Sequence, residues 1–135
     1  MIADAPITAI VPAPSTPWNL WRRGFSLAAL AAADLAAGSG HPLALALRRR
    51  GGSKQTQLDA TARKHNLQGK IRCRTPMHGV VLLVDDVLTT GATASACAAA
   101  LRELGAAEIR FATLCAVPPP DPERERWTDP SESGM

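Results

Sequence analysis

The sequence has few cysteines and no long apolar segment. Its three cysteines, Cys73, Cys97 and Cys115, include no closely spaced pair. An odd number without a CxxC pair fits neither a disulfide framework nor a cysteine zinc site. We therefore expect reduced thiols in a cytoplasmic protein, with Cys97 and Cys115 in the core. The longest apolar run, residues 27–37, contains an aspartate and is too short for a membrane-spanning helix, which needs about 20 residues. The N-terminus also lacks the charged start and apolar run of a signal peptide.

Aromatic side chains are scarce as well, with two Phe, three Trp and no Tyr in 135 residues. Because alanine supplies much of the apolar content and fills little volume, we expect one domain with a lean core. The net charge is +3, with basic residues concentrated between residues 48 and 74. A mild positive excess suits an anionic small molecule as well as nucleic acid, so charge alone does not choose between them.

The order of predicted elements is that of an α/β protein. A helix is predicted to begin after Ser26 and to end at Gly38 or Gly40. A proline-rich loop is expected over residues 12–25. Further helices are predicted at 58–67 and 92–104, and strands at 7–11, 43–47, 80–84 and 109–117. This alternation predicts a mostly parallel sheet flanked by helices in one domain, residues 1–117. Residues 118–135 are proline-rich and charged, so we expect a disordered tail.

The segment VLLVDDVLTTGAT, residues 81–93, contains the residues that indicate a ligand-binding site. An apolar strand runs into Asp85 and Asp86 and then into a Thr-rich turn that starts a helix. Ligands of open α/β sheets bind beyond the carboxyl ends of the strands. The turn offers backbone N–H groups, hydroxyls and a helix N-terminus, which together suit a phosphate, and Gly91 allows close approach. Two carboxylates beside it suit a diol, so the segment predicts a sugar phosphate such as ribose 5-phosphate.

Other proteins also end a Val-rich strand in two aspartates. A Walker-type ATPase needs a GxxxxGK[ST] loop, which the sequence lacks. A receiver domain places its acidic pair near its start, and the chain after Asp86 is too short for that. Acid-nucleophile phosphatases need acids at alternate positions, and Val87 breaks that spacing. These alternatives are weaker than sugar-phosphate binding.

The same segment resembles the motif that binds 5-phosphoribosyl 1-pyrophosphate (PRPP) in type I phosphoribosyltransferases. All thirteen positions match: four apolar residues, two acids, two apolar residues and Thr-Thr-Gly-x-Thr. The resemblance implies a phosphoribosyltransferase-type, Rossmann-like α/β fold. It also implies that the turn holds the 5-phosphate, that the acids contact the ribose hydroxyls, and that Mg²⁺ arrives with PRPP rather than on direct protein ligands. The implied PRPP-binding residues are Asp85, Asp86, Thr89, Thr90, Gly91, Ala92 and Thr93.

A narrower resemblance, to the ComF competence-protein family, covers residues 7–117. Its elements are a strand ending in Pro-x-Pro, an Arg-Gly-Phe element, a Gln-x-x-Leu…Arg-x-x-Asn stretch and the PRPP motif. The matching residues are Pro12, Pro14, Arg23, Gly24, Phe25, Gln55, Leu58, Arg63 and Asn66. Two departures stand out: Ser26-Leu27 replaces the usual Asn-Gln, and the cysteine-rich zinc module of full-length members does not precede Met1. The latter leaves two options, a misplaced start or a short family member.

The resemblance also implies roles outside the main motif. Ser15, Arg22 and Arg23 follow the first strand, where phosphoribosyltransferases receive pyrophosphate; simple solvated arginines are an equally good interpretation. The stretch RRRGGSK, residues 48–54, fits a catalytic flap, a nucleic-acid contact or plain surface.

Three functions remain open: a phosphoribosyltransferase with an unknown acceptor, a non-catalytic PRPP-binding module, and a component of DNA uptake in natural competence. The third would involve single-stranded DNA or the competence machinery as a partner. The sequence also leaves a homodimer open.

Overall fold

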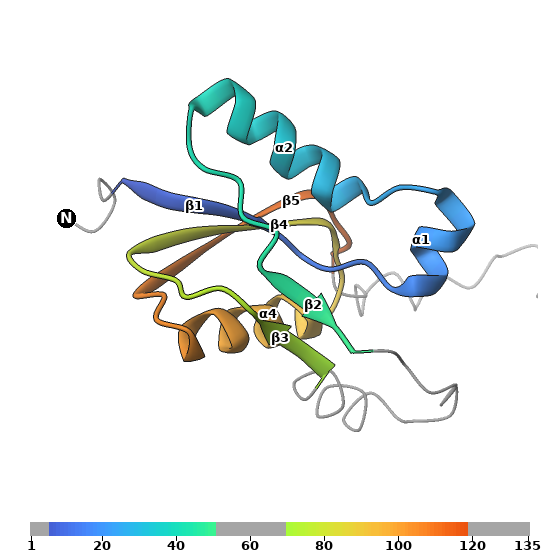
Figure 1. Ribbon diagram of the computed structural model, residues 1–135. Coiled ribbons are helices and arrows are strands. Elements are labelled where there is room, and N and C mark those ends of the chain that lie inside the picture. The colour runs from blue at the N-terminus through green and yellow to red at the C-terminus, as the bar shows by residue number, and fades with distance from the viewer. Residues whose placement is uncertain (1–5, 51–69, 119–135) are drawn as a thin grey trace, which may run out of the picture.

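The computed structural model describes residues 6–50 and 70–118 (Figure 1). Its main sheet has three parallel strands in the order β1-β4-β5: β1 (Ile7–Pro12), β4 (Val80–Leu88) and β5 (Glu108–Ala116). The helices are α1 (Pro17–Arg23), α2 (Leu27–Ser39) and α4 (Ala92–Glu103). A small antiparallel sheet pairs β2 (Leu47–Arg49) with β3 (Ile71–Cys73). The predicted α/β fold with a mostly parallel sheet flanked by helices is confirmed. The predicted helix at 58–67 and the predicted tail from 119 onward lie outside the described residues.

Strand β4 is the centre of the main sheet and is longer than predicted. Its first half is buried between two strands and two helices, as a continuous apolar run requires. Pairing with β5 continues through Asp85↔Thr113 to Leu88↔Ala116, and the Val117 N–H donates to the Leu88 carbonyl at 2.8 Å. The acidic pair therefore lies within the end of the strand, not after it, because β5 keeps offering backbone partners to that point.

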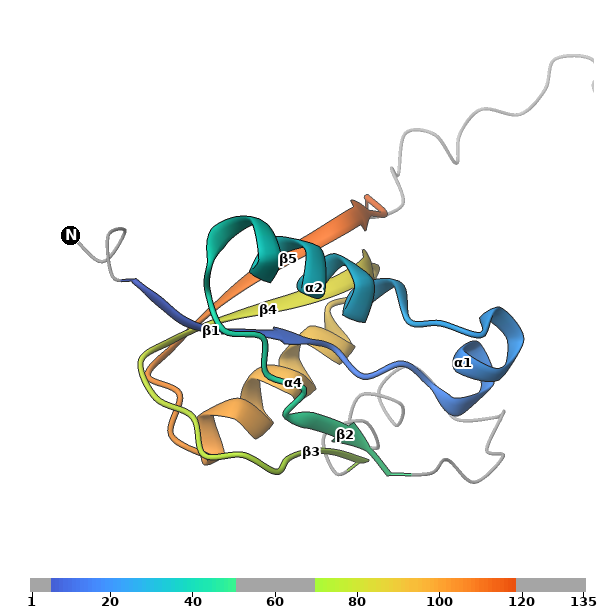
Figure 2. The ribbon, with the colours of Figure 1, turned by 45° about the horizontal axis from the view of Figure 1, so that its top comes forward.

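Helices α2 and α4 cover opposite faces of the sheet (Figure 2). On the α2 side, Ala32 packs with Ile10 and Val84. On the α4 side, Cys97 and Leu101 belong to a larger cluster that includes Val11, Val81, Leu83 and residues of β2 and β3. No aromatic side chain is among the buried hydrophobic residues of the described part of the chain. The core is lean, as the composition predicts.

Local capping fixes where α2 begins and ends. Ser26 Oγ accepts from the Ala29 N–H at 3.2 Å, as predicted. The helix ends at Gly40, whose φ of 75° is left-handed and whose N–H donates to the Ala36 carbonyl. Gly40 therefore ends the helix, and Gly38 lies within it.

The predicted loop over residues 12–25 is wrong in its second half, which forms α1. Thr16 Oγ1 accepts from the Asn19 N–H at 3.1 Å, Pro17 is the first helical residue, and Gly24 closes the helix with a left-handed φ of 74°. Thr-Pro is a helix-start signal, since proline lacks only an N–H that the first turn leaves unpaired anyway. Pro12 and Pro14 outweighed that signal in the prediction.

Two further predictions need correction. The second strand lies at Leu47–Arg49 rather than 43–47, because pairing with β3 sets its register; Leu43 forms only an isolated bridge with Ile10. Cys115 is exposed, since β5 is an edge strand of the described sheet and few side chains cover it, whereas Cys97 is buried as predicted.

None of the helices in residues 6–50 and 70–118 is long and apolar enough to cross a membrane.

Candidate functional site

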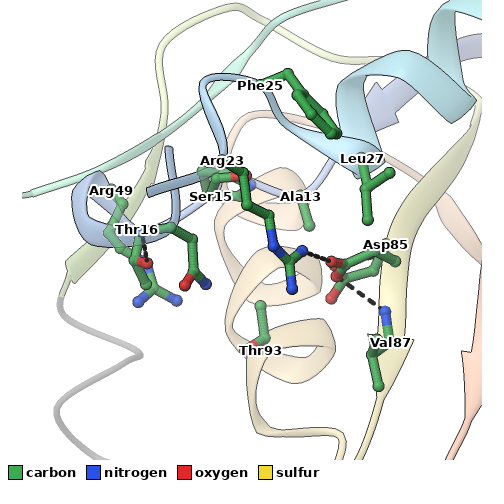
Figure 3. A pocket seen from close by; sticks show the side chains of 13 residues that line it. Ala13, Ser15, Thr16, Arg23, Phe25, Leu27, Arg49, Asp85, Val87 and Thr93 are labelled. Atoms are coloured by element: carbon green, nitrogen blue, oxygen red, sulfur yellow. Dashed lines mark hydrogen bonds and ion pairs between the residues drawn. The ribbon is translucent and has the colours of Figure 1, made fainter. Parts of the chain in front are cut away.

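A cavity of about 180 Å³ opens where β1 and β4 end side by side (Figure 3). The two strands stay joined at this end, since the Ala13 N–H donates to the Val84 carbonyl at 2.8 Å. Six parts of the chain contribute to the lining. They are the segment after β1, helix α1, the connection from α1 into the start of α2, strand β2, the end of β4 and the first turn of α4. A site built from strand ends and helix termini is the usual ligand position in an open α/β sheet.

The acidic pair forms one wall of this cavity. Asp85 Oδ1 accepts from the Asp86 N–H at 2.8 Å, and Asp86 Oδ1 accepts from the Val87 N–H at 2.9 Å. Burial raises the pKa of Asp85 to about 6; Asp86 adds to the rise, and the Arg49 guanidinium opposes it. Each carboxylate keeps its second oxygen outside these backbone bonds, so both can accept hydrogen bonds from a ligand.

Two arginines approach the acids from different elements. Arg23, from the end of α1, places Nη1 3.6 Å from Asp86 Oδ2 (Figure 3). Arg49, from β2, is half-buried, and its Nε is buried without a hydrogen-bond partner within the described part of the chain. Burial lowers the pKa of Arg49, while Cys97 and Asp85 act in the opposite direction. The cavity therefore combines two carboxylates with two guanidinium groups.

The Thr-rich turn lies beside the cavity and leads into α4. Gly91 occupies the N-cap of α4 with a left-handed φ of 78° and, as a glycine, has no side chain to cap the helix. Thr90 Oγ1 accepts from the Ala92 N–H at 3.3 Å. A Cβ built on Gly91 would meet only Leu88 Cδ1, at 4.0 Å. The turn thus presents an open helix N-terminus, a backbone arrangement that favours a phosphate.

Five of the residues predicted from the sequence line the cavity together: Ser15, Arg23, Asp85, Asp86 and Thr93. Thr89, Thr90, Gly91 and Ala92 form the adjacent turn and are not among the lining residues. Arg22 is exposed and does not line the cavity.

Sequence reasoning did not single out Arg49, Thr16, Asn19 or Phe25 as lining residues. Arg49 stood in a basic run with three competing interpretations. Its distinguishing signal is the alternation along β2, where Leu47 is buried, Arg48 exposed and Arg49 partly buried, and this appears only once the strand register is known. Thr16 and Asn19 could have been found from the Thr-Pro helix start.

Cys97 lies near the cavity-lining residues Asp85 and Arg49 but is unsuited to nucleophilic chemistry. Its side chain is fully buried. Burial raises the pKa of the thiol to about 12, with Asp85 adding to the rise and Arg49 opposing it. A neutral buried thiol is inert, so Cys97 acts as a packing residue.

A parallel sheet flanked by helices, with an acidic pair and an open phosphate-type turn at its strand ends, defines a phosphoribosyltransferase-type α/β domain. The family model described as "Phosphoribosyl transferase domain" matches residues 20–129, and the chain belongs to this family. Its curated relatives are DNA utilization proteins YhgH, which belong to the ComF family, so the narrower resemblance is confirmed as well.

The chain is 36% identical over 109 residues to DNA utilization protein YhgH of Salmonella typhi, covering 78% of this chain and 48% of that protein. The corresponding protein of Escherichia coli (strain K12) is 34% identical over the same length and coverage. The chain thus spans about half the length of the curated relatives it matches. Among solved structures, the "allosteric regulatory enzyme of purine biosynthesis" superposes with a TM-score of 0.54 at 22% identity, covering 82% of this chain and 22% of that one. That likeness supports the fold.

Proposed function

We propose that this domain binds PRPP and that it transfers the phosphoribosyl group to a nitrogen nucleophile. The observation that carries the proposal is that Asp85, Asp86, Arg23 and the first turn of α4, with its open N-terminus, all line one cavity. A phosphate alone would be repelled by two carboxylates. A ligand with a phosphate at one end, a diol in the middle and a diphosphate at the other end offers a complementary group to each part of this site.

In the proposed reaction, the nitrogen lone pair attacks C1 of the ribose and the bond from C1 to the pyrophosphate oxygen breaks. Pyrophosphate leaves with the bonding electrons, and the nitrogen then loses a proton. Because C1 develops positive charge, positioning and charge stabilisation contribute more than covalent catalysis. Asp85 and Asp86 would orient the ribose, residues 89–93 would hold the 5-phosphate, and Arg23 would neutralise the departing pyrophosphate.

Magnesium fits this site as a companion of the ligand. The described residues contain no cluster of three or more His, Cys, Asp or Glu side chains that could hold a metal ion. Mg²⁺ keeps several waters and commonly binds through one or two carboxylates plus substrate phosphates. The carboxylates available here are Asp85 and Asp86, and Mg²⁺ bound with PRPP would reduce the charge of the diphosphate. We further propose a cytoplasmic location, where such a substrate would be met.

The direct test is thermal unfolding of the chain with PRPP and Mg²⁺, using ribose 5-phosphate and ATP as controls. PRPP at about 100 times its dissociation constant should add roughly 2.7 kcal/mol, an upward shift of the midpoint on the order of 10 °C. The double variant Asp86→Asn/Thr90→Val should unfold at the wild-type midpoint without ligand and lose the shift. An unchanged shift in that variant would overturn the site assignment.

Turnover separates an enzyme from a non-catalytic binding module. Pyrophosphate release with a panel of bases and amines would establish transfer. PRPP binding without release on any acceptor would favour the binding module.

A second candidate function, contact with single-stranded DNA, has its own observation. Arg48 and Arg72 lie directly opposite each other across β2 and β3, and both are exposed, as are Arg50 and Arg74. Like charges directly opposite each other destabilise a strand pair unless an anion lies between them. The name of the relatives, DNA utilization protein, agrees with a nucleic-acid partner.

A further inference from the structure

Asp86 already has a charged partner inside the site proposed to bind ribose. Arg23 Nη1 lies 3.6 Å from Asp86 Oδ2, while Asp86 Oδ1 accepts from the Val87 N–H. The oxygen that a sugar hydroxyl would approach is therefore the one that faces the guanidinium. Figure 3 shows the Arg23 side chain extending across the cavity towards the acidic pair.

This ion pair is easily exchanged for another. A separation of 3.6 Å exceeds the 2.7–2.9 Å typical of strong charge-assisted hydrogen bonds. The two side chains keep 48% and 31% of their surface exposed, so water competes with the pair. Pairs of this kind shift an equilibrium by no more than about fivefold.

The backbone at Arg23 is held by hydrogen bonds of α1. A change of partner by Arg23 therefore requires only a movement of its side chain. Arg23 is the last residue of α1, and the Gly24 N–H donates to the Leu20 carbonyl at 2.7 Å. At the other end of α1, Thr16 caps the helix and itself lines the cavity. A rotation of the Arg23 side chain would therefore keep the guanidinium within reach of the cavity.

We propose that Arg23 makes the site selective for a sugar phosphate that also carries a diphosphate, by holding Asp86 until such a ligand arrives. This inference rests on the proposed function. Ribose 5-phosphate must displace Arg23 from Asp86 and offers it no new partner at C1. PRPP displaces the same guanidinium but offers it diphosphate oxygens, which match its planar fork. Arg23 thus weakens the binding of ribose 5-phosphate and strengthens the binding of PRPP.

The test compares dissociation constants of ribose 5-phosphate and PRPP, both with Mg²⁺, by calorimetry in wild type, Arg23→Gln and Arg22→Gln. Arg23→Gln should bind ribose 5-phosphate about two to five times more tightly, because Asp86 is freed. It should bind PRPP at least about ten times more weakly, because charged hydrogen bonds to the diphosphate are lost. Arg22→Gln removes the same charge at the neighbouring residue, whose side chain lies outside the cavity. It therefore serves as the control for the loss of one positive charge near the site. Arg22→Gln should leave the dissociation constants of both ligands close to those of wild type.

The opposite signs for the two ligands distinguish this inference from simpler roles. If Arg23→Gln weakens both ligands alike, Arg23 is an ordinary phosphate contact and the inference is wrong. If the dissociation constants of both ligands are the same in Arg23→Gln as in Arg22→Gln, Arg23 is a solvated surface charge and the inference is also wrong. Failure of the wild type to bind PRPP would instead overturn the proposed function. Arg23→Gln should keep the wild-type unfolding midpoint without ligand, since both partners are partly exposed.

Discussion

The Asp85 carboxylate lies between the cavity and the core, and its surroundings oppose its charge. Burial raises its pKa to about 6 and the adjacent Asp86 side chain adds to the rise, whereas the Asp86 backbone N–H and the Arg49 guanidinium lower the pKa. Arg49 in turn has a buried Nε without a partner among the described residues. Arg49 thus has hydrogen-bonding capacity that the described protein atoms leave unused, and a polar ligand in the cavity would satisfy it.

Asp85→Asn should stabilise the free protein in a pH-dependent manner. A carboxyl whose pKa rises on folding, here from 3.8 to about 6, favours folding while it is protonated. That contribution is complete below about pH 3.8 and is lost as the pH rises through about 6. Asparagine has no charge to desolvate. The unfolding midpoint of Asp85→Asn should therefore match wild type near pH 4 and exceed it increasingly up to about pH 7.

Thermal unfolding of both proteins from pH 4 to pH 8 checks this, with Asp34→Asn, on the exposed side of α2, as the control. A constant difference between Asp85→Asn and wild type across this range would contradict a raised pKa for Asp85.

At the residue scale, local motifs could be predicted from the sequence and cross-chain neighbours could not. Asp85, Asp86 and Thr93 all belong to the strand-turn-helix segment 81–93, so their proximity follows from the motif itself. Arg49 reaches the same cavity from β2, and its position depends on pairing with Ile71. Such pairing is set by tertiary packing, which a single sequence does not display.

The same distinction holds for elements. Strands and helices with long apolar patterns and clear caps, β4 and α2, were predicted within a few residues of their observed ends. The shorter elements α1 and β2 were missed or shifted. Seven residues of α1 depend on a single capping threonine, and three residues of β2 depend on a partner strand. Short elements contain too few turns or pairs for periodicity to identify them.

The β2-β3 pair presents basic residues on its outer side, and this element should contribute to binding of single-stranded DNA. Arg48 and Arg72 are opposite each other and exposed. Arg48→Gln/Arg72→Gln should weaken binding of an oligonucleotide and reduce the slope of log affinity against log salt by about 1.4, at about 0.7 per lost phosphate contact.

Fluorescence anisotropy over a salt series measures this slope. The double variant Arg22→Gln/Arg102→Gln, which removes two exposed arginines from helices, controls for net charge. Equal slopes in the two double variants would mean that β2 and β3 form no specific DNA contact.

At the scale of the whole molecule, stability depends on a small number of aliphatic side chains. The largest fully buried residues are Ile10, Leu83, Leu101, Val11, Val81, Val84 and Cys97. Domains of this size are stable by only about 5–15 kcal/mol. A ligand that binds only the folded state, at about 100 times its dissociation constant, adds roughly 2.7 kcal/mol, a sizeable fraction of that total.

Leu101→Ala should therefore destabilise the domain strongly, and PRPP should restore part of the loss. Leu101 is fully buried on α4, within the cluster that packs α4 against the sheet. Removing its side chain costs about 2–5 kcal/mol, since both burial and packing are lost. Thr93 and the open N-terminus belong to the first turn of the same helix, two turns away. If the helix stays docked, the stabilisation by PRPP should equal that of wild type, because distant effects add.

Unfolding midpoints of wild type, Leu101→Ala and Leu30→Ala, each with and without PRPP, test this additivity. Leu30 is 57% exposed on α2, so the same substitution there should change the midpoint little. A wild-type midpoint in Leu101→Ala would contradict the packing of α4. A folded Leu101→Ala that no longer responds to PRPP would show that core packing along α4 holds the phosphate-binding turn in place, since Leu101 itself does not line the cavity.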